Sequence, residues 1–284
     1  MGARGTAGKI LVGYLALSSI AAVIAFARGR NSLLLLIAHL AALAICTALF
    51  FRPIADSRAL SVIPLVSFPF LYAELPHLLL SSQFHDDAVQ AWEAFIFGAS
   101  PAHTAAGRWP WLPLSELLHG AYLSYYAIIY VPPLYLYLRG DREKFERTVT
   151  ALMAVFAVCF LFFIVYPVAG PRYLWSPSPG IPDGPVRRLA LWLLASGSSK
   201  GAAFPSSHVA VSTTQTLTAR QWNRAGGAIL GMLTVLLAAG AVYGGFHYAI
   251  DTIAGAVVGV AVVYVLRVVP ARWATRQDCI SAGQ

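Results

Sequence analysis

The chain has few charged residues. Only 11% of its 284 residues are Asp, Glu, Lys or Arg, whereas 58% are hydrophobic. A soluble globular domain carries about 25% charged residues, so this composition excludes an ordinary soluble protein and indicates a polytopic membrane protein. The net charge of +8 is spread thinly over short loops. This distribution argues against a nucleic-acid-binding surface and is typical of the charge bias that orients membrane helices.

Cysteine is also scarce. Cys46 and Cys159 lie inside apolar runs and Cys279 lies in the last segment, so the sequence has neither a disulfide framework nor cysteines at metal-binding spacing. It contains no internal repeat and no low-complexity tract, and we therefore expect one helical membrane domain. No group of side chains has the spacing of a convincing metal cage, so no metal or other cofactor is expected.

Long apolar runs are what the chain does contain. A helix needs roughly 20 apolar residues to cross a bilayer. Eight runs approach this length: residues 10–27, 33–51, 60–81, 117–138, 148–167, 205–219, 225–244 and 249–268. The predicted fold class is therefore all-α, a polytopic membrane helical bundle of about eight transmembrane helices. The first run follows Arg4 and Lys9 without a clear cleavage site, so we expect it to be retained as a helix.

The positions of Lys and Arg predict the orientation of these helices. With eight crossings, 13 of the 20 basic residues fall on the side of the termini and 7 on the opposite side. The positive-inside rule then places both termini in the cytoplasm and the long segments 82–116 and 168–204 at the outer face. Residues 86–97 repeat apolar side chains at helical spacing, which predicts an interfacial helix whose start is capped by Asp86 and Asp87.

Two polar side chains stand at the start of the last apolar run. His247 and Asp251 lie at positions i and i+4, so on a helix they share one face with Cβ atoms about 5–6 Å apart. An ionised Asp at the mouth of a membrane helix costs roughly 2–4 kcal/mol unless it is paired or faces a wet cavity. The carboxylate can orient or polarise the imidazole, which favours a functional pair over a buried structural one.

A second polar group opens the sixth run. Ser206 and Ser207 follow Pro205 at a predicted helix start, where free backbone N–H groups and the helix dipole favour an anion. The same serines could instead only cap the helix. His208 lies in that first turn, and two membrane crossings separate it from His247, so both imidazoles return to one face of the membrane.

Two basic residues near these groups are candidates for binding a phosphate. Arg172 lies just past the fifth run and can form bidentate hydrogen bonds with a phosphate, although an Arg at the interface also commonly extends toward headgroups. Lys200 shortly precedes the helix start and is a weaker candidate. The sequence leaves open the roles of four further polar residues near or within the apolar runs. These are Glu74 and His77, which lie at positions i and i+3, together with Glu116 and His119.

Four short motifs occur in order with compatible helices between them: FGASP at 97–101, GPRY at 170–173, AFPSSH at 203–208 and HYAID at 247–251. Together they resemble the type 2 phosphatidic acid phosphatase superfamily, and its inositol phosphorylceramide synthase-like and sphingomyelin synthase-like branch. The resemblance covers roughly residues 84–260 and leaves the first two helices outside. It implies two N-terminal transmembrane helices at 1–58, a catalytic six-helix membrane core at 59–270 and a cytoplasmic tail at 271–284.

The resemblance also implies a mechanism and a set of site residues. His247 would attack phosphorus and form a phosphohistidine, with Asp251 holding its tautomer. His208 would protonate the leaving oxygen as general acid. The phosphate-binding residues would be Arg172, Ser206, Ser207 and Lys200. The family needs no metal.

Two positions depart from the pattern of the phosphatases in this superfamily. Ser207 stands where they have Gly, and Ala241 stands where they carry an Arg six residues before the nucleophilic His. The head-group transferase branch also lacks that Arg. A phosphodiester carries one negative charge fewer than a phosphomonoester, so the loss of one cation is physically consistent with transfer between phosphodiesters.

The sequence therefore favours a phospholipid head-group phosphotransferase of the inositol phosphorylceramide synthase-like type. It would act at the outer face on a phospholipid or lipid phosphate, with an alcohol or lipid acceptor. A lipid phosphate phosphatase that hydrolyses phosphatidate or polyprenyl phosphate is the first alternative. A non-catalytic lipid-binding or translocating membrane protein is the second. The sequence does not identify the lipid, the acceptor or the oligomeric state.

Overall fold

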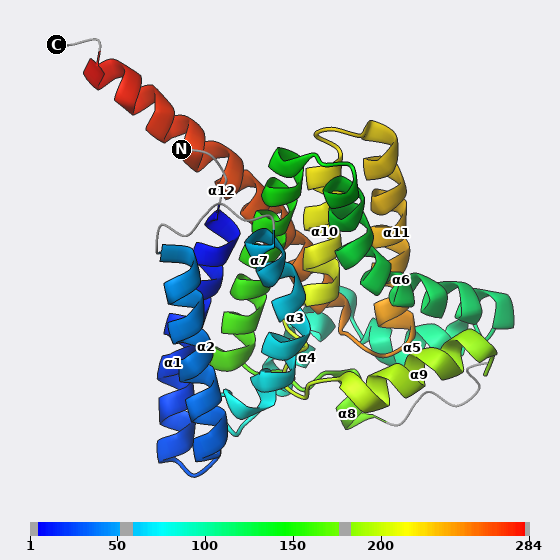
Figure 1. Cartoon of the computed structure of the whole chain (residues 1–284). Helices are drawn as coiled ribbons and strands as arrows, with labels where there is room; N and C mark the ends of the chain where they lie inside the picture. Colours follow the sequence, from blue (N-terminus) through cyan, green and yellow to red (C-terminus); the bar gives the residue numbers. More distant parts are fainter. Residues whose placement is uncertain (1–4, 52–58, 176–182, 282–284) are drawn as a thin grey trace.

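The computed structural model describes residues 5–51, 59–175 and 183–281, and the regular elements in these ranges are helices (Figure 1). The α-helices are α1 (Thr6–Ala27), α2 (Leu33–Phe51), α3 (Ile63–Glu74), α4 (Asp86–Phe97), α5 (Pro101–Arg108), α6 (Leu112–Leu138), α7 (Arg142–Val165), α8 (Pro171–Leu174), α9 (Pro185–Gly197), α10 (Ser207–Ala219), α11 (Arg224–Tyr243) and α12 (Ala249–Ser281). Two short 3-10 turns, η1 (Leu60–Val62) and η2 (Leu75–His77), flank α3. The predicted all-α fold class is confirmed.

Each of the eight predicted apolar runs contains one helix of the bundle. Within the described part of the chain, five helices are long and apolar enough to cross a membrane: α1, α2, α7, α11 and α12. Helices α3 and α10 have only 12 and 13 residues. At 1.5 Å per residue they are about 20 Å long or less, shorter than the roughly 30 Å of a hydrocarbon core. Helix α12 runs on to Ser281, so residues 271–281 of the predicted tail continue this helix.

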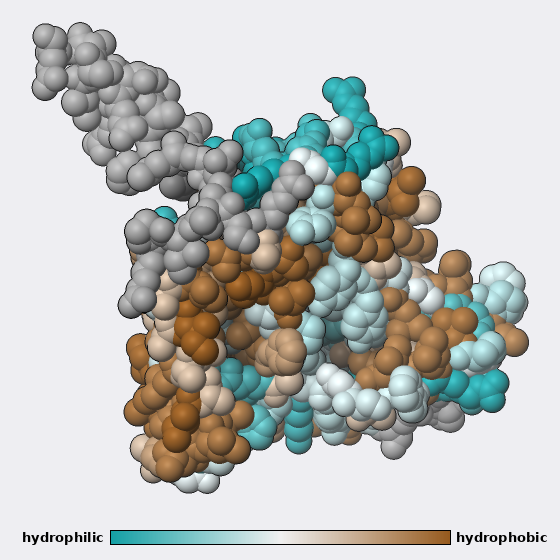
Figure 2. All heavy atoms as spheres, in the orientation of Figure 1, coloured by the Kyte–Doolittle hydropathy of each residue, from teal (hydrophilic) through white to brown (hydrophobic). Residues whose placement is uncertain are grey.

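The two ends of the bundle differ in what they carry. The α6–α7 and α10–α11 turns lie at one end, where α1 also begins and α12 ends, while α4, α5, α8 and α9 gather at the other end (Figure 1). Hydrophilic residues collect around those turns, and hydrophobic residues cover the flank formed by α1 and α2 (Figure 2). Large apolar side chains on the flanks are well exposed, as at Leu34, Phe70 and Val235. This pattern fits a bundle whose flanks contact lipid.

Helices α10 and α12 pack closely because two glycines of α12 face α10. A Cβ atom on Gly255 would lie 2.4 Å from the Ser206 carbonyl oxygen, and one on Gly259 would lie 2.6 Å from the Ala210 carbonyl oxygen. Both glycines therefore let the backbone of α12 touch α10, as small residues four apart do between membrane helices. This contact holds the start of α12 against the start of α10, where His208 lies.

The N-terminal helices α1 and α2 pack on each other, and α1 also packs on α7 and α3. Nδ1 of His39 on α2 lies 2.7 Å from Oε1 of Glu74 at the end of α3. Glu74 and His77 share the third run in the sequence, but in the structure Glu74 is paired with His39, and His77 is exposed. Spacing along one segment could not predict a pair formed between two helices.

Candidate functional site

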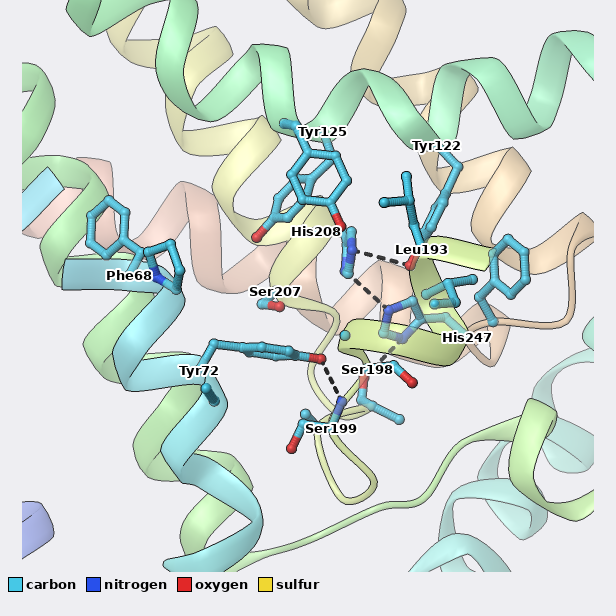
Figure 3. Close-up of a pocket in the computed structure, with 18 of the residues that line it drawn as sticks. Phe68, Tyr72, Tyr122, Tyr125, Leu193, Ser198, Ser199, Ser207, His208 and His247 are labelled. Atoms are coloured by element: carbon cyan, nitrogen blue, oxygen red, sulfur yellow. Dashed lines mark hydrogen bonds between the residues drawn. The ribbon is translucent and has the colours of Figure 1, made fainter. Parts of the chain in front are cut away.

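A cavity of about 350 Å³ lies where the loops at one end of the bundle meet α3, α6, α9 and α10 (Figure 3). It contains four of the residues predicted to form the site: Arg172, Ser207, His208 and His247. Asp251 lies directly behind His247, with its Oδ2 atom 3.4 Å from Nδ1 of the imidazole. The structure therefore brings together side chains that lie nearly 80 residues apart in the chain.

His247 is held by contacts to one side of its ring. Its Nδ1 atom lies 3.0 Å from the Ala203 carbonyl oxygen, which is a closer partner than the Asp251 carboxylate. Because both partners are acceptors, we assign the proton to Nδ1 and the lone pair to Nε2. His247 itself precedes α12, and Asp251 in the first turn accepts a hydrogen bond from the Tyr248 N–H at 2.9 Å. The side chains of His247 and Asp251 are therefore brought together by a turn, and not by lying on one face of a helix.

His208 lies in the first turn of α10 and contacts three aromatic or imidazole rings. Its Nδ1 atom is 3.4 Å from Nε2 of His247, and its Nε2 atom is 3.1 Å from the Tyr122 hydroxyl. The Tyr125 ring packs against the imidazole with 4.1 Å between centroids. The sequence analysis assigned no part in the site to Tyr122 or Tyr125 of α6. Their positions at i and i+3 on α6 were the signal that both could face one partner.

Arg172 lies in the short helix α8 and lines the cavity. Its Nη1 atom is buried and has no hydrogen-bond partner within the described part of the chain. Its guanidinium also lies over the Tyr173 ring, 5.1 Å from the centroid. A buried guanidinium nitrogen without a partner is unusual, and a phosphate oxygen would satisfy it.

The remaining predicted phosphate ligands occupy different environments. Ser207 lines the cavity, but the Ser206 hydroxyl caps α10 by accepting a hydrogen bond from the Val209 N–H at 3.4 Å. Lys200 is exposed and does not line the cavity; its Nζ atom lies 4.8 Å from the centroid of the Phe84 ring. Of the four phosphate-binding candidates, Arg172 and Ser207 are the two that face the cavity.

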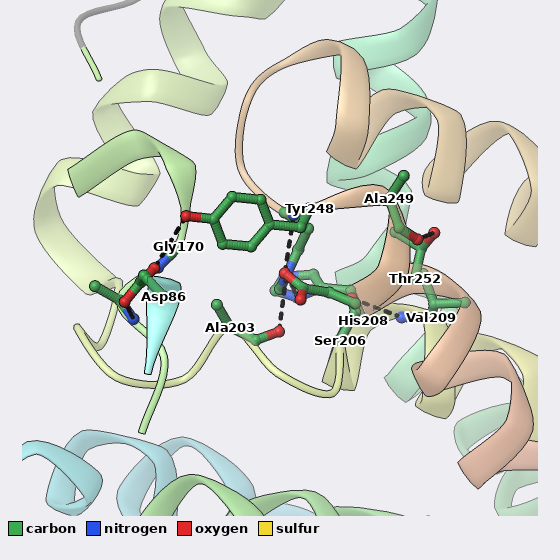
Figure 4. A network of polar contacts seen from close by, with 12 residues as sticks. Asp86, Gly170, Ala203, Ser206, His208, Val209, Tyr248, Ala249 and Thr252 are labelled. Carbon is green, nitrogen blue, oxygen red and sulfur yellow. Dashed lines mark hydrogen bonds and ion pairs between the residues drawn. The ribbon is translucent and has the colours of Figure 1, made fainter. Parts of the chain in front are cut away.

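Asp86 does not cap α4, contrary to the sequence prediction. Its carboxylate is buried and accepts hydrogen bonds from the backbone N–H groups of Ala169 and Gly170, at 2.8 and 2.9 Å (Figure 4). It also accepts one from the Tyr248 hydroxyl at 3.1 Å. Burial raises the pKa of the Tyr248 hydroxyl, and the adjacent Asp86 charge raises this pKa further. Asp86 thus joins the loop before Arg172 to Tyr248, the residue that directly follows His247.

A second acid braces the start of α12. Glu93 on α4 is buried, and its carboxylate accepts hydrogen bonds from the Ala249 N–H and the Ser100 hydroxyl. Burial raises the pKa of Glu93 above its ordinary value of 4.5. Sequence analysis assigned α4 only as an interfacial helix and gave neither acid a part in the site. Among the described residues, no group of three or more His, Cys, Asp or Glu side chains could hold a metal ion.

The fold and the site define an all-α membrane protein with two imidazoles, a carboxylate and a guanidinium around one cavity, and one nitrogen of that guanidinium has no partner among the described residues. The family model of the PAP2 superfamily matches residues 87–265, which is more than half of the chain, and the chain belongs to this superfamily. Its members are phosphatases and phosphotransferases, so membership supports an integral membrane enzyme that acts on lipid phosphoesters. No curated protein and no solved structure matches the chain. The match includes all the candidate site residues, while α1, α2 and α3 lie outside it.

Proposed function

We propose that the protein is a phospholipid head-group phosphotransferase that works through a phosphohistidine on His247. The orientation of the His247 ring is the observation that supports this role most directly. The Ala203 carbonyl and Asp251 occupy Nδ1, so the lone pair of Nε2 is directed toward the cavity. An imidazole held by acceptors on one nitrogen is the arrangement that activates the other as a nucleophile.

The first half of the reaction transfers the phosphoryl group to the enzyme. Nε2 of His247 forms a bond to phosphorus while the bond from phosphorus to the leaving oxygen breaks, and His208 gives its proton to that oxygen. In the structure Nε2 and Nδ1 of the two rings are only 3.4 Å apart, so substrate binding must separate them to admit the phosphoryl group. The Tyr122 hydroxyl holds the far nitrogen of His208 and can keep its ring oriented during this movement.

The second half returns the phosphoryl group to an acceptor. His208, now neutral, accepts the proton of an alcohol hydroxyl whose oxygen attacks phosphorus, and the P–N bond to His247 breaks. Arg172 would compensate the charge of the phosphoryl oxygens, with the Ser207 hydroxyl as a further donor. Asp251 would stabilise the positive charge of the phosphorylated imidazole through the 3.4 Å contact.

The environment of Ala241 favours transfer over hydrolysis. Ala241 is fully buried against Tyr122 and Phe246, and its carbonyl oxygen accepts hydrogen bonds from the N–H groups of Phe246 and His247. A long cationic side chain would not fit there without moving these rings. Among the described residues that line the cavity, Arg172 alone carries a fixed positive charge. One cation matches the single charge of a phosphodiester better than the two charges of a phosphomonoester.

Helices α8 and α9, which contribute to the lining of the cavity, lie at the end of the bundle opposite the α6–α7 and α10–α11 turns (Figure 1). In and beside those turns are Arg139, Arg142, Lys144, Arg220 and Arg224. By the positive-inside rule these basic turns would face the cytoplasm. We therefore place the reaction at the outer leaflet, in contact with the extracytoplasmic solvent.

The test uses purified protein in lipid with radiolabelled phospholipids or lipid phosphates, with and without alcohol acceptors, beside a His247→Ala control. New lipid that depends on the acceptor and is absent with His247→Ala would support the proposal. Free phosphate without new lipid would overturn transfer in favour of a lipid phosphate phosphatase. Equal lipid binding by both proteins with no product would overturn catalysis and favour a lipid-binding or translocating protein.

A further inference from the structure

The cavity extends well beyond the polar groups of the candidate site. From His247 and Arg172 it continues to a part lined by apolar and aromatic side chains of α3, α6 and α7: Phe68, Pro69, Ile129, Tyr130 and Phe156. Figure 3 shows Phe68 and Tyr72 of α3 on the opposite side of the cavity from His247. One continuous space therefore has a polar end that fits a phosphate and an apolar end that fits a hydrocarbon chain.

The apolar end opens on the flank of the bundle. Pro69 and Ala73 of α3 and Tyr126 of α6 line the cavity, and all three are exposed rather than buried. Helix α3 packs chiefly on α7 and α1, whereas α6 packs on α7, α9, α10 and α11. The opening is therefore a gap between α3 and α6, on a face where Phe70 and other large apolar side chains are exposed to the surroundings. In a membrane this flank contacts lipid chains.

Helix α3 is attached to the active-site loop at its carboxyl end. The Ser199 N–H donates a hydrogen bond to the Tyr72 hydroxyl at 3.0 Å, and Tyr72 and Ser199 both line the cavity. This contact joins a helix outside the family match to the loop that leads to Ser207 and His208. A shift of α3 would therefore change both the width of the opening and the position of the loop.

The α1–α2 hairpin holds the same end of α3. Both ring nitrogens of His39 lie near acceptors, Nδ1 at 2.7 Å from Glu74 and Nε2 at 3.2 Å from the Leu15 carbonyl oxygen. In the turn between the two helices, Arg28 and Arg30 donate hydrogen bonds to the carbonyl oxygens of Leu80 and Leu79, just after η2. These contacts fix the carboxyl end of α3 through residues that do not line the cavity.

We propose that α3 is the wall that binds the hydrocarbon chain of the lipid substrate and determines chain-length preference, and that the α1–α2 hairpin positions this wall through the His39–Glu74 contact. The proposal rests on the function proposed above. The lipid enters from the membrane between α3 and α6, its chain lies along α3, and its phosphate reaches Arg172 and His247. His39 and Glu74 are positioning residues, since neither lines the cavity.

The first test compares Ala73→Trp with Phe70→Trp. Ala73 lines the opening, whereas Phe70 lies three residues earlier on α3, is 75% exposed and does not line the cavity. We expect Ala73→Trp to raise KM for a long-chain phospholipid about tenfold, with a much smaller change for a short-chain form of the same phospholipid. Phe70→Trp should leave both values unchanged. Equal effects of the two variants, or equal changes for both chain lengths, would overturn the assignment of α3.

The second test examines the His39–Glu74 contact by a double-mutant cycle that consists of His39→Leu, Glu74→Leu and the double variant. Each single variant should lower the preference for the long chain about fivefold or more by raising KM rather than lowering kcat, because it removes the His39–Glu74 contact and leaves the other side chain without it. The double variant should recover much of the preference. Thr47→Ala on the exposed side of α2 serves as control, since the Thr47 hydroxyl donates a hydrogen bond within its own helix, to the Leu43 carbonyl oxygen. Additive single effects, or a change in kcat alone, would contradict the positioning role.

A binding measurement separates this inference from the proposed function. A long-chain phospholipid with a photoreactive group in its acyl chain should cross-link to α3 and α6 near Ala73 and Tyr126, even in the His247→Ala protein. The Ala73→Trp variant should reduce this labelling, whereas Phe70→Trp should not. Labelling of the wild-type protein without turnover would support the proposed chain-binding site and overturn the proposed enzymatic function. Turnover without labelling at α3 would support the enzymatic function and overturn the chain-binding site.

Discussion

Nε2 of His247 lies 3.4 Å from Nδ1 of His208, although the two residues are 39 positions apart, one just before α12 and the other in the first turn of α10. Neither ring is fixed by this contact alone. His247 is held through Nδ1 by the Ala203 carbonyl, and His208 is held through Nε2 by the Tyr122 hydroxyl. The facing nitrogens are thus the pair that can exchange a proton or separate around a substrate, while the outer nitrogens keep each ring in place.

Replacing Tyr122 by Phe tests the support of His208. The variant keeps the ring beside the imidazole but removes the hydroxyl, 3.1 Å from Nε2. We expect kcat to fall about tenfold, the effect of one lost hydrogen bond of ordinary strength, with KM nearly unchanged. Tyr137→Phe, on the same helix and far from the cavity, is the matched control. A normal kcat for Tyr122→Phe would show that the hydroxyl does not orient the ring.

Asp251→Asn should reduce kcat by about 10²- to 10⁴-fold, because an amide cannot stabilise the charge on His247 and can present a donor to Nδ1. The substitution preserves shape, and Asn retains an acceptor for the Tyr248 N–H. The measurement is single-turnover phosphoenzyme formation, with thermal unfolding in detergent to check that the fold persists. A loss of less than about threefold would remove Asp251 from the mechanism.

Asp86 should matter for stability because three donors depend on it. Asp86→Ala leaves the N–H groups of Ala169 and Gly170 and the Tyr248 hydroxyl without their acceptor. We expect the free energy of unfolding to fall by about 3 kcal/mol or more, since each buried unsatisfied group costs about 1–3 kcal/mol. Asp87→Ala, next to it and exposed, should change stability by about 0.5 kcal/mol or less. Equal effects at both positions would restore the helix-capping interpretation.

Glu93 should make stability depend on pH in a defined direction. Burial raises its pKa in the folded protein above the ordinary value of 4.5, so the folded state binds more protons than the unfolded chain between these two values. The contribution of this group to stability is therefore largest below 4.5 and is lost as the pH rises through the folded pKa. Glu93→Gln should flatten this part of the profile in denaturant unfolding at several pH values. An unchanged difference between wild type and variant across that range would contradict the prediction.

Gly255→Ala should separate α12 from α10. The added Cβ would lie 2.4 Å from the Ser206 carbonyl oxygen, so the helices must move apart and the His247–His208 distance must grow. We expect a loss of about 1–3 kcal/mol in stability together with reduced kcat. Gly13→Ala in α1 is the control, because nothing lies within 4 Å of the position its Cβ would take. A stable and fully active Gly255→Ala protein would show that this backbone contact does not set the site geometry.

The apolar runs and ordered motifs were sufficient to predict the bundle and the meeting of His208 with His247. Each signal is local, and counting membrane crossings determines which loops share an end. Membership of the superfamily is confirmed, while the specific branch and the roles of the site residues stay predictions.

Contacts between distant segments could not be predicted in this way. Asp86 bonds backbone groups 83 and 84 residues away, whereas a carboxylate at a helix start most often caps its own helix. The Glu74–His39 pair likewise joins two helices whose relative rotation no pattern specifies. Helix α9 also escaped prediction, because it lies within the segment 168–204 that was interpreted as an outer loop.

The opening of the cavity on the flank, beside Ala73 and Tyr126, determines which concentration scale applies to a lipid that enters there. A substrate that arrives from the side diffuses in two dimensions, so the quantity that saturates the protein is its mole fraction in the membrane. Adding inert lipid at constant amounts of substrate and protein would then slow the reaction, although the molar concentration of substrate in the sample has not changed. The acceptor arriving from water would follow ordinary molar concentration, and the two reactants would obey different dilution laws.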